Sequence, residues 1–380
     1  MAGAFTLITP TEIVFGRGHI AQLNERAGKL GSRALVVHGK TPGRLAGVFE
    51  SLNAIDIVQT LAIEKEPDLN TLTAAIEEGK LLGIDLVVGI GGGSVMDSAK
   101  VLAAMLPSET GLMSHLEVVG DGLPLTAKRL PLILVPTTSG TGAEVTRNAV
   151  VDVPDAQRKV SLRDNQLLPD LALVDPALTD NCPKTVSLHS GLDAITQVIE
   201  PYLSSRANLF TDMLCREAIP KGLAAIKQLM SNESAEARDA LAQVSLFGGL
   251  ALANSGLGVV HGIAGPLGSL CGAPHGAICG ALLPAGIAAN RDSVVEADHK
   301  ARIDQVIGWI AEVFETSPDQ ALPRFRAWIA ESGLLGLASI GVNEDHIIAA
   351  TQAAATSSSM KANPVVLHAE TIEAVMRQSL

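Results

Sequence analysis

Short apolar runs alternate with helical patterns in the first half of the chain. Apolar runs of strand length stand at residues 34–37, 86–90 and 132–135, and residues 69–82 between them carry apolar positions at helical spacing. Strands that alternate with helices are typical of βαβ units, in which the strands pair in parallel. The pattern therefore predicts an α/β domain with a parallel sheet.

The second half of the chain lacks such strand runs. Its apolar positions follow helical spacing over residues 188–203, 209–229 and 235–252. Between the halves, DPALTDNCP at residues 175–183 combines two prolines with turn formers. We expect an α/β domain over residues 1–180, followed by an all-helical domain over residues 181–380.

One long stretch, residues 247–290, contains no Lys, Arg, Asp or Glu. Its length alone would permit a membrane span. His261, His275 and several prolines interrupt it, however, and these residues disfavour a lipid-facing helix. We interpret the stretch as a buried helical core around a polar site and expect no membrane partner.

Composition and charge narrow the class of protein. A chain of 380 residues usually forms more than one core, and 3% aromatic residues mean that aliphatic side chains build those cores. A net charge of −12 without a basic cluster excludes a nucleic-acid partner. No secretory signal begins the sequence, so we expect a cytoplasmic protein. The four cysteines form no CxxC pair and are interpreted as buried free thiols.

The segment LVVGIGGGS at residues 86–94 indicates a nucleotide site. An apolar run of strand length is followed directly by glycines, and apolar positions at helical spacing begin at Val95. Glycines let the backbone approach a pyrophosphate, and the N-terminus of the helix attracts it. A tight turn without a ligand would use the same residues. The strand at 132–135 also runs into a glycine-rich loop, PTTSGTG, and two such loops at strand ends form the crevice where nucleotides bind.

These loops carry a resemblance to a known family. GGGSVMDSAK at residues 91–100 and PTTSGTGAEV at residues 136–145 are similar to the paired cofactor motifs of the iron-containing alcohol dehydrogenases. Further segments follow in that family's order and spacing: LPDLALVDP from Leu168, GLDA from Gly191, His261-Gly262, PHG from Pro274, and Asn363-Pro364.

The resemblance extends from about residue 5 to the C-terminus and implies a function. A member of this family is an NAD(P)-dependent oxidoreductase that interconverts a small alcohol and its aldehyde or ketone with the help of a metal. Hydride transfer then takes place in a cleft between an α/β nucleotide-binding domain and an all-helical metal domain.

The resemblance also assigns residues to the cofactor site. Those implied are Gly39, Gly91, Gly92, Gly93, Ser94, Asp97, Thr137, Thr138, Lys159 and Thr179. Relatives that prefer NAD often have an Asp where this chain has Gly39, because that carboxylate binds the ribose 2′-hydroxyl. Without it, Lys40 or Arg44 could pair with a 2′-phosphate. The sequence leans to NADP and leaves NAD open.

Four positions of the family's metal site fall on Asp193, Gln197, His261 and His275. Asp193 and Gln197 stand one helical turn apart. Relatives usually have His at the second position, and the amide oxygen of Gln197 is a weaker ligand. The other three still suit Fe²⁺ or Zn²⁺, and they are the predicted catalytic residues because a metal there would polarise a carbonyl.

Two departures from the family leave alternatives open. Besides Gln197, Gly265 replaces a histidine that many relatives carry near the substrate, so no proton carrier is assigned. His189, one turn before Asp193, could substitute as a ligand or base. A weak or absent metal, with hydrogen bonds alone orienting the substrate, also remains open.

Other functions within and beyond this superfamily compete with the dehydrogenase. A maleylacetate-reductase-like enzyme is disfavoured because VMDSAK at residues 95–100 follows the alcohol dehydrogenase form. A dehydroquinate-synthase-like lyase would need more basic residues near the metal helices, and a nonenzymatic binding module is supported only by the two altered positions. We expect a small alcohol or carbonyl substrate, and further copies of this chain in a homodimer or higher homo-oligomer.

Overall fold

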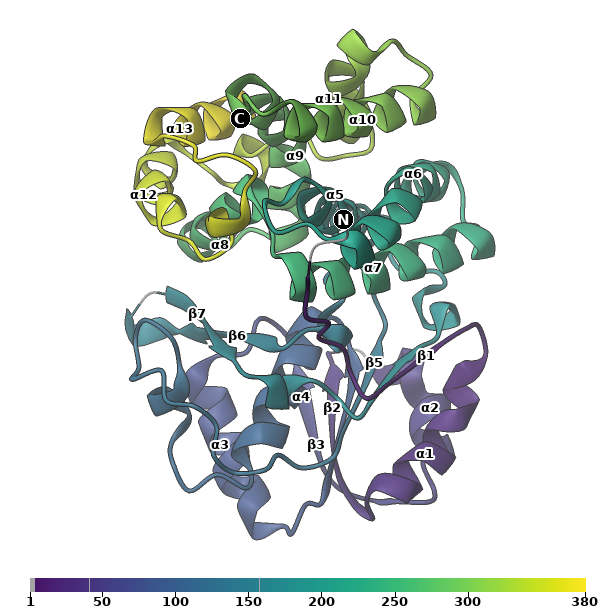
Figure 1. The fold of residues 1–380 in the computed structure, drawn as a ribbon. Helices are drawn as coiled ribbons and strands as arrows, with labels where there is room; N and C mark the ends of the chain where they lie inside the picture. Colours follow the sequence, from purple (N-terminus) through teal and green to yellow (C-terminus); the bar gives the residue numbers. More distant parts are fainter. Residues whose placement is uncertain (1–3, 41, 157) are drawn as a thin grey trace. The chain divides into compact units, whose positions relative to one another are not determined.

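The computed structural model describes residues 4–40, 42–156 and 158–380. The chain divides into two compact units, and each is described by itself (Figure 1). The α/β unit comprises Thr9–Thr138 and Gly142–Asp180, and the helical unit comprises Asn181–Leu380, Ser139–Thr141 and the residues up to Ile8. Ser139–Thr141 lies within the second glycine-rich loop, so the chain passes from one unit to the other and back inside that loop.

A six-stranded parallel sheet forms the centre of the α/β unit. In spatial order its strands are β1 (Glu12–Phe15), β8 (Leu171–Val174), β5 (Leu132–Pro136), β4 (Leu86–Gly91), β2 (Arg33–Gly39) and β3 (Asp56–Ile63). Every residue of β4, β5 and β8 is buried, as expected for strands that are covered on both faces. The predicted strands are β2, β4 and β5, so the α/β fold class is confirmed. The inner strand β8 and the edge strands β1 and β3 were not predicted.

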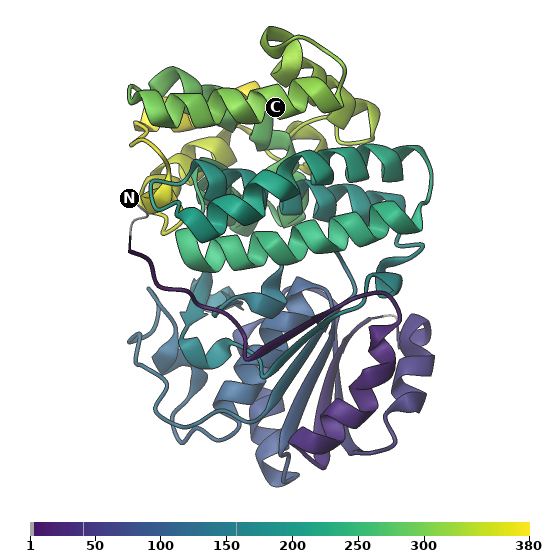
Figure 2. The ribbon, with the colours of Figure 1, turned by 45° about the vertical axis from the view of Figure 1, so that its right-hand side comes forward.

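Helices cover both faces of this sheet, as Figures 1 and 2 show. On one face, α1 (Leu23–Leu30) and α2 (Ala46–Ser51) pack on an aliphatic core that includes Val36 and Val88. On the other face, α3 (Leu69–Leu81) and α4 (Gly93–Met105) pack on a core that includes Leu35. Neighbouring residues of one strand point to opposite faces, which is why the two cores take alternate positions.

A β-hairpin that the sequence pattern did not predict packs beside α4. Its strands, β6 (Asn148–Val153) and β7 (Arg158–Arg163), pair antiparallel. Alternate residues of β6 are buried, so one face of the hairpin packs on the unit and the other is partly exposed. The backbone N–H of Val150 donates to the Asp97 carboxylate over 3.0 Å, which ties the hairpin to α4.

The helical unit consists of helices around one aliphatic core. Its α-helices are α5 (Lys184–Leu203), α6 (Leu209–Ser231), α7 (Ala235–Ser255), α8 (Val259–Cys271), α9 (His275–Ser293), α10 (Ala297–Val313), α11 (Ala321–Glu331), α12 (Glu344–Ala355) and α13 (Ala369–Gln378). The structure describes residues 181–380 completely and assigns no strand to them, so the expectation of an all-helical second half is confirmed.

The uncharged stretch forms the end of α7, all of α8 and most of α9, and many of its residues belong to the buried core. Among the described residues, no single helix is both long and apolar enough to cross a membrane. The pair α7 and α8 reaches the required length and hydropathy together, but the two helices bend by 100° at the break between them.

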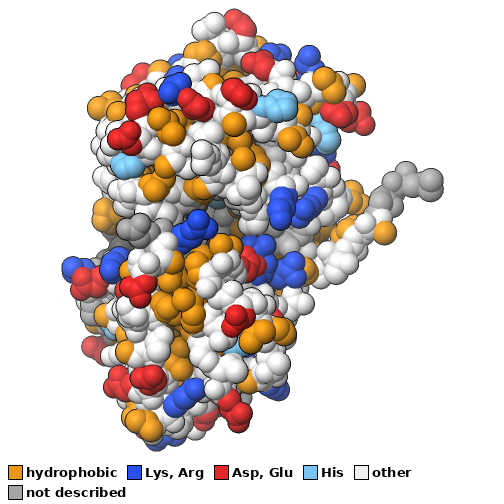
Figure 3. Space-filling view, turned by 90° about the vertical axis from the view of Figure 1, so that its left-hand side faces the viewer, with side chains coloured by type: hydrophobic (Ala, Val, Ile, Leu, Met, Phe, Trp, Pro, Cys, Tyr) orange, Lys and Arg blue, Asp and Glu red, His pale blue; other side chains and the backbone are white. Residues whose placement is uncertain are grey.

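Charged side chains of both signs are interspersed on the surface that Figure 3 shows. On this face, Lys and Arg side chains lie among Asp and Glu side chains and do not form one continuous basic surface.

Candidate active site

Four polar side chains from three helices of the helical unit meet at one point. They are Asp193 of α5, His261 of α8, and His275 and Cys279 of α9, and one ligand atom of each lies within 4.8 Å of all the others. Oδ1 of Asp193 is 3.3 Å from Nε2 of His261 and 3.8 Å from Nε2 of His275. Sγ of Cys279 is 3.6 Å from Nε2 of His275. We refer to these four residues as the Asp-His-His-Cys cluster.

Two glycines allow α9 to pack against α5 closely enough to form this cluster. A Cβ atom at Gly276 would stand 2.2 Å from the backbone oxygen of His189, and one at Gly280 would stand 2.4 Å from Cδ1 of Leu192. Both distances are far below van der Waals contact, so any larger residue would push the helices apart. The first two turns of α9, which carry His275 and Cys279, therefore reach Asp193 only because glycines stand beside them.

The cluster contains buried polar atoms that the protein leaves without hydrogen bonds. Asp193 is 3% exposed and His261 is 7% exposed. Oδ1 of Asp193 and Nε2 of His261 have no hydrogen-bond partner among the described residues, although they face each other. Leaving such an atom unsatisfied costs about 1–3 kcal/mol. A divalent cation between these atoms would satisfy both, so the residues present fit a metal.

Glu200 of α5 orients His261. The Glu200 carboxylate accepts hydrogen bonds from Nδ1 of His261 over 2.6 Å and from the backbone N–H groups of Val260 and His261 over 2.6 and 3.3 Å. Because a carboxylate only accepts, Nδ1 carries the hydrogen and Nε2 is the nitrogen that faces Asp193. A histidine held in this way by a carboxylate is typical of metal ligands.

Sequence reasoning did not identify Glu200, although a signal was present. Glu200 follows Asp193 by seven residues, which is about two helical turns, so both carboxylates lie on one face of α5. Thr196 and Gln197 lie between the two carboxylates on that face, and all four residues are buried. A second carboxylate at this spacing on a buried helix indicates a partner inside the protein.

Neighbouring charges shift the pKa values within the cluster. Burial acts to raise the pKa of Asp193, but the two adjacent imidazoles outweigh burial and the pKa is lowered. Burial acts to lower the pKa of His261, but Cys279, Asp193 and Glu200 raise it well above its usual value. For His275, the effects of Cys279 and Asp193 likewise exceed that of burial and raise the pKa to about 9. A metal binds neutral imidazole, so its binding must release protons.

Gln197 is placed differently from the three other predicted ligands. It lies one turn after Asp193 on α5 and is 3% exposed. Its side-chain nitrogen donates to the backbone oxygen of Thr141 over 2.6 Å, which ties the amide to the Ser139–Thr141 segment. The role of Gln197 as a ligand stays a prediction.

A test of the orienting role of Glu200 is the variant Glu200→Gln, which retains the shape of the side chain but not its charge. We expect Zn²⁺ affinity to fall roughly 10- to 100-fold, because outer partners of metal-bound histidines contribute that much. Competition with a chromogenic chelator measures the affinity. The matched control is Glu217→Gln on the exposed side of α6, which should leave the affinity unchanged. Equal affinity in both variants would contradict the role of Glu200.

The glycine-rich loop after β4 has the form that the sequence predicts. Gly92 is the N-cap of α4 and provides no side-chain cap, so the first N–H groups of α4 are not capped by that residue. The backbone N–H of Thr137 donates to the oxygen of Gly91 over 2.8 Å. A Cβ atom at Gly92 would stand 3.3 Å from Oγ1 of Thr138. Within the α/β unit, the structure thus brings Gly91–Ser94 next to Thr137 and Thr138.

Asp97 and Lys159 already interact with protein groups. Beyond its bond to the hairpin, the Asp97 carboxylate lies 3.5 Å from the buried ammonium group of Lys100. Burial raises the pKa of Asp97, and Lys100 only partly opposes this effect. Lys159, on β7, forms an ion pair with Glu66. The roles of Asp97 and Lys159 in the cofactor site therefore stay predictions.

Thr179 and Gly39 lie at two further points of the α/β unit. Thr179 is 4% exposed, and its hydroxyl donates to the backbone oxygen of Pro176 over 2.7 Å. Gly39 ends β2, which pairs with β4, so it lies at the same edge of the sheet as the loop from Gly91. No described atom lies within 4 Å of the position that a Cβ would take at Gly39.

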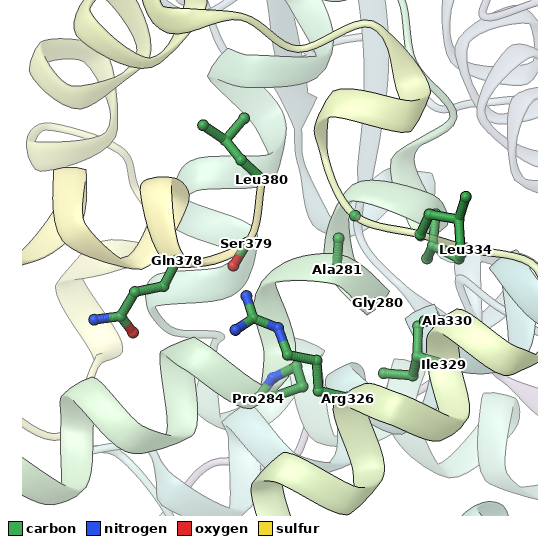
Figure 4. Close-up of a pocket in the computed structure, with 12 residues that line it drawn as sticks. Gly280, Ala281, Pro284, Arg326, Ile329, Ala330, Leu334, Gln378, Ser379 and Leu380 are labelled. Atoms are coloured by element: carbon green, nitrogen blue, oxygen red, sulfur yellow. The ribbon is translucent and has the colours of Figure 1, made fainter.

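A pocket of about 320 Å³ in the helical unit lies away from the Asp-His-His-Cys cluster. Figure 4 shows Arg326 of α11 beside Pro284 of α9, with the C-terminal residues 378–380 to their left and Leu334 to their right. No residue of the cluster lines this pocket.

Comparison with known proteins connects this fold and this site to one class of enzyme. The family model described as "Iron-containing alcohol dehydrogenase" matches residues 10–176, and the model of the C-terminal part of the Fe-containing alcohol dehydrogenase family matches residues 187–380. A metal-assisted oxidoreductase of alcohols and carbonyl compounds is the class of enzyme that the fold, the Asp-His-His-Cys cluster and both family matches define together. The chain belongs to the iron-containing alcohol dehydrogenase family.

Named relatives agree with this assignment. The chain is 31% identical to the probable alcohol dehydrogenase EutG of Escherichia coli (strain K12), over 94% of this chain and 90% of that protein. It is 30% identical to the 4-hydroxybutyrate dehydrogenase of Cupriavidus necator, over 97% and 98% respectively. The crystal structure of a 1,3-propanediol oxidoreductase is 26% identical and covers all of both chains with a TM-score of 0.87.

The chain is therefore an enzyme that transfers hydride between a nicotinamide cofactor and an alcohol or carbonyl compound. This finding excludes the nonenzymatic binding module. The maleylacetate-reductase-like and dehydroquinate-synthase-like alternatives lose support, because these relatives are named as an alcohol dehydrogenase, a hydroxybutyrate dehydrogenase and a propanediol oxidoreductase.

Proposed function

We propose that the enzyme interconverts a small alcohol and its aldehyde or ketone at a divalent metal held by Asp193, His261 and His275. The observation that carries this proposal is the pair of buried, unpartnered atoms, Oδ1 of Asp193 and Nε2 of His261, that face each other over 3.3 Å. A carboxylate and two imidazoles suit Fe²⁺ or Zn²⁺. When bound, the metal would polarise the substrate carbonyl and stabilise the negative charge that develops on its oxygen.

The residues around the metal would divide the remaining tasks. Asp193 supplies a negative charge, and Glu200 holds the His261 ring in place. The side chain of His275 is 38% exposed, whereas those of Asp193 and His261 are almost completely buried. Substrate therefore approaches the cluster on the side of His275. Gly265 stands one turn after His261 and has no side chain, so no proton carrier is assigned to this position. No described atom lies within 4 Å of the position that a Cβ would take there.

We propose that the loop Gly91–Gly93 and Ser94 bind the pyrophosphate of the nicotinamide cofactor. The N-terminus of α4, which Gly92 leaves without a side-chain cap, supports this, because its N–H groups and helix dipole attract phosphate. The adjacent Thr137 and Thr138 would add hydroxyl donors. Asp97, Lys159 and Thr179 stay in the proposed cofactor site on the strength of the family motif.

We also infer that NADP is accepted alongside NAD and is preferred. Gly39 presents no carboxylate to repel a 2′-phosphate, and there is open space beside it. Lys40 pairs with Glu64 over 2.9 Å, and both side chains are exposed. An exposed pair of this kind contributes about 0–1 kcal/mol, so Lys40 could leave Glu64 for a phosphate. The side chain of Arg44 lies outside the described part of the structure.

The variant Gly39→Asp tests this preference. We expect the ratio of kcat/KM for NADP to that for NAD to fall about tenfold, or ~1.4 kcal/mol, because the new carboxylate repels a 2′-phosphate. The open space at Gly39 should accommodate the side chain without strain. Gly39→Asn has the same size without the charge and should change the ratio much less. If Asp and Asn act alike, or neither has an effect, cofactor choice is determined elsewhere.

The proposed function is tested most directly by metal content and turnover together. The purified enzyme is stripped with a chelator, reloaded with Zn²⁺ or Fe²⁺, and assayed with a panel of small alcohols and aldehydes and both cofactors. We expect activity to disappear on stripping and to return on reloading. Full activity in stripped protein without detectable metal would overturn the metal-assisted proposal.

The division into domains and the assembly are further proposals. We propose that residues 1–180 and 181–380 form the two domains, and the separation of the compact units near Asp180 supports this. A homodimer or higher homo-oligomer remains a prediction, which light scattering on the purified protein would check.

A further inference from the structure

We propose that Cys279 is the fourth protein ligand of the metal and fills the role that the sequence assigned to Gln197. The inference rests on the proposed function, because it deepens the assignment of the same metal site. It also specifies the metal, since a thiolate ligand favours Zn²⁺ over Fe²⁺ and Mg²⁺.

Distances within the Asp-His-His-Cys cluster support this assignment. Ligand atoms bound to zinc at about 2.0–2.3 Å in a tetrahedral arrangement lie roughly 3.3–3.8 Å apart. The separations of 3.3 Å between Asp193 and His261, 3.8 Å between Asp193 and His275, and 3.6 Å between Cys279 and His275 fall in this range. Three of the six separations within the cluster thus match the spacing that one zinc ion requires, and the other three are at most 4.8 Å.

Cys279 is well placed to be held at this position. It follows His275 by four residues on α9, so both side chains project from one face of the helix. The thiol is completely buried and forms no disulfide. Its Sγ lies 3.6 Å from Nε2 of His275, itself a proposed ligand. A buried thiol that faces a carboxylate and two imidazoles has the surroundings of a metal ligand and not those of an ordinary core residue.

Gln197 is engaged elsewhere. Its side-chain nitrogen donates to the backbone oxygen of Thr141, so the amide contributes to positioning the Ser139–Thr141 segment. An amide oxygen is also a weaker ligand for Zn²⁺ than a thiolate. The ligand lost at Gln197 on α5 is therefore supplied by Cys279 on α9.

Binding through Cys279 has a defined proton balance. The thiol loses its proton to solvent as the Zn–S bond forms, and the metal keeps its oxidation state. Zinc with four protein ligands can still expand to five-coordinate, so this ligand set is compatible with substrate binding.

Cobalt substitution is the most direct test, because Co²⁺ bound by a thiolate shows a sulfur-to-metal charge-transfer band in the near ultraviolet. The full-length protein is stripped of metal and titrated with Co²⁺. We expect the band to appear in the unaltered protein and in Cys271→Ser, and to be absent from Cys279→Ser. Cys271 is a matched control because it lies outside the cluster, at the end of the helix that carries His261.

Zn²⁺ and Mg²⁺ affinities provide a second readout. We expect Cys279→Ser to weaken Zn²⁺ binding at least tenfold and Mg²⁺ binding much less, because only the soft metal gains from sulfur. Gln197→His should restore part of the Zn²⁺ affinity in the Cys279→Ser background by adding an imidazole on α5. In the presence of Cys279 the same change should have a smaller effect.

The outcomes separate this inference from the function on which it rests. Cobalt that binds in a His261-dependent way without a charge-transfer band in the unaltered protein would overturn the role of Cys279 and leave the metal site intact. Equal metal binding in the unaltered protein and in His261→Ala would instead overturn the proposed metal site itself. The spectrum of the unaltered protein decides the first question even if Cys279→Ser fails to fold.

Discussion

His261→Ala is expected to remove most of the bound metal and to lower kcat/KM by about 10³-fold. The variant deletes one of the proposed ligands and leaves the Glu200 carboxylate buried without its imidazole partner. Stabilisation of developing charge by a metal amounts to several kcal/mol, and about 4 kcal/mol corresponds to 10³-fold in rate. Metal content by mass spectrometry and steady-state kinetics on the same preparation measure both effects.

A matched control separates loss of the ligand from loss of the fold. His368→Ala replaces an exposed histidine at the N-cap of α13, outside the cluster, and should leave metal content and kcat/KM unchanged. Thermal unfolding of His261→Ala shows whether the helical unit stays cooperative. A folded His261→Ala protein with normal metal content and normal turnover would contradict the assignment of the active site.

Gly92→Val is expected to weaken binding of the nicotinamide cofactor by about 100-fold or more, equivalent to ~2.7 kcal/mol. The added side chain would occupy the space in which the pyrophosphate approaches the N-terminus of α4. Gly92 has φ −85°, a conformation open to any residue, and a Cβ would meet only Thr138 at 3.3 Å. We therefore expect the fold to survive. Quenching of protein fluorescence or isothermal calorimetry measures the affinity.

Gly111→Val is the control for this variant. Gly111 lies in the same unit, is exposed, has an extended conformation, and has no described atom within 4 Å of the position of a Cβ. Its substitution should leave cofactor affinity unchanged. If Gly92→Val binds NAD and NADP as well as Gly111→Val does, the cofactor is held by another part of the chain.

Local sequence pattern predicted the strands β2, β4 and β5 and the helices α3, α5, α6 and α7, and it missed the short buried strand β8. The strands β2, β4 and β5 are continuous apolar runs because both their faces are buried, and such runs are visible in a short window. The edge strands β1 and β3 are half exposed and mix polar with apolar residues, so they give no such run. The sequence pattern did not predict the hairpin of β6 and β7, because contacts with α4 and with the residues before α3 hold it in place.

The same contrast holds for the candidate site. The position of the glycine-rich loop was predicted correctly, because its strand, its turn and its helix follow one another directly in the sequence. Asp193, His261 and His275 were assigned through resemblance to a family, and the structure brings all three together. Neither source indicated Glu200, whose partner His261 lies on another helix, or Cys279, which joins the cluster only where α9 meets α5 and α8.

The sequence by itself determined the order of the elements, the change from α/β to helical structure, and which residues share a face of one helix, because these features depend on the spacing of neighbouring residues. Only the tertiary structure decided which helices meet. Glycines at 276 and 280 let α9 approach α5, and that approach brings Cys279 to Asp193 while Gln197 bonds to Thr141. Contacts between helices depend on close packing of whole side chains, which no periodicity in the sequence records.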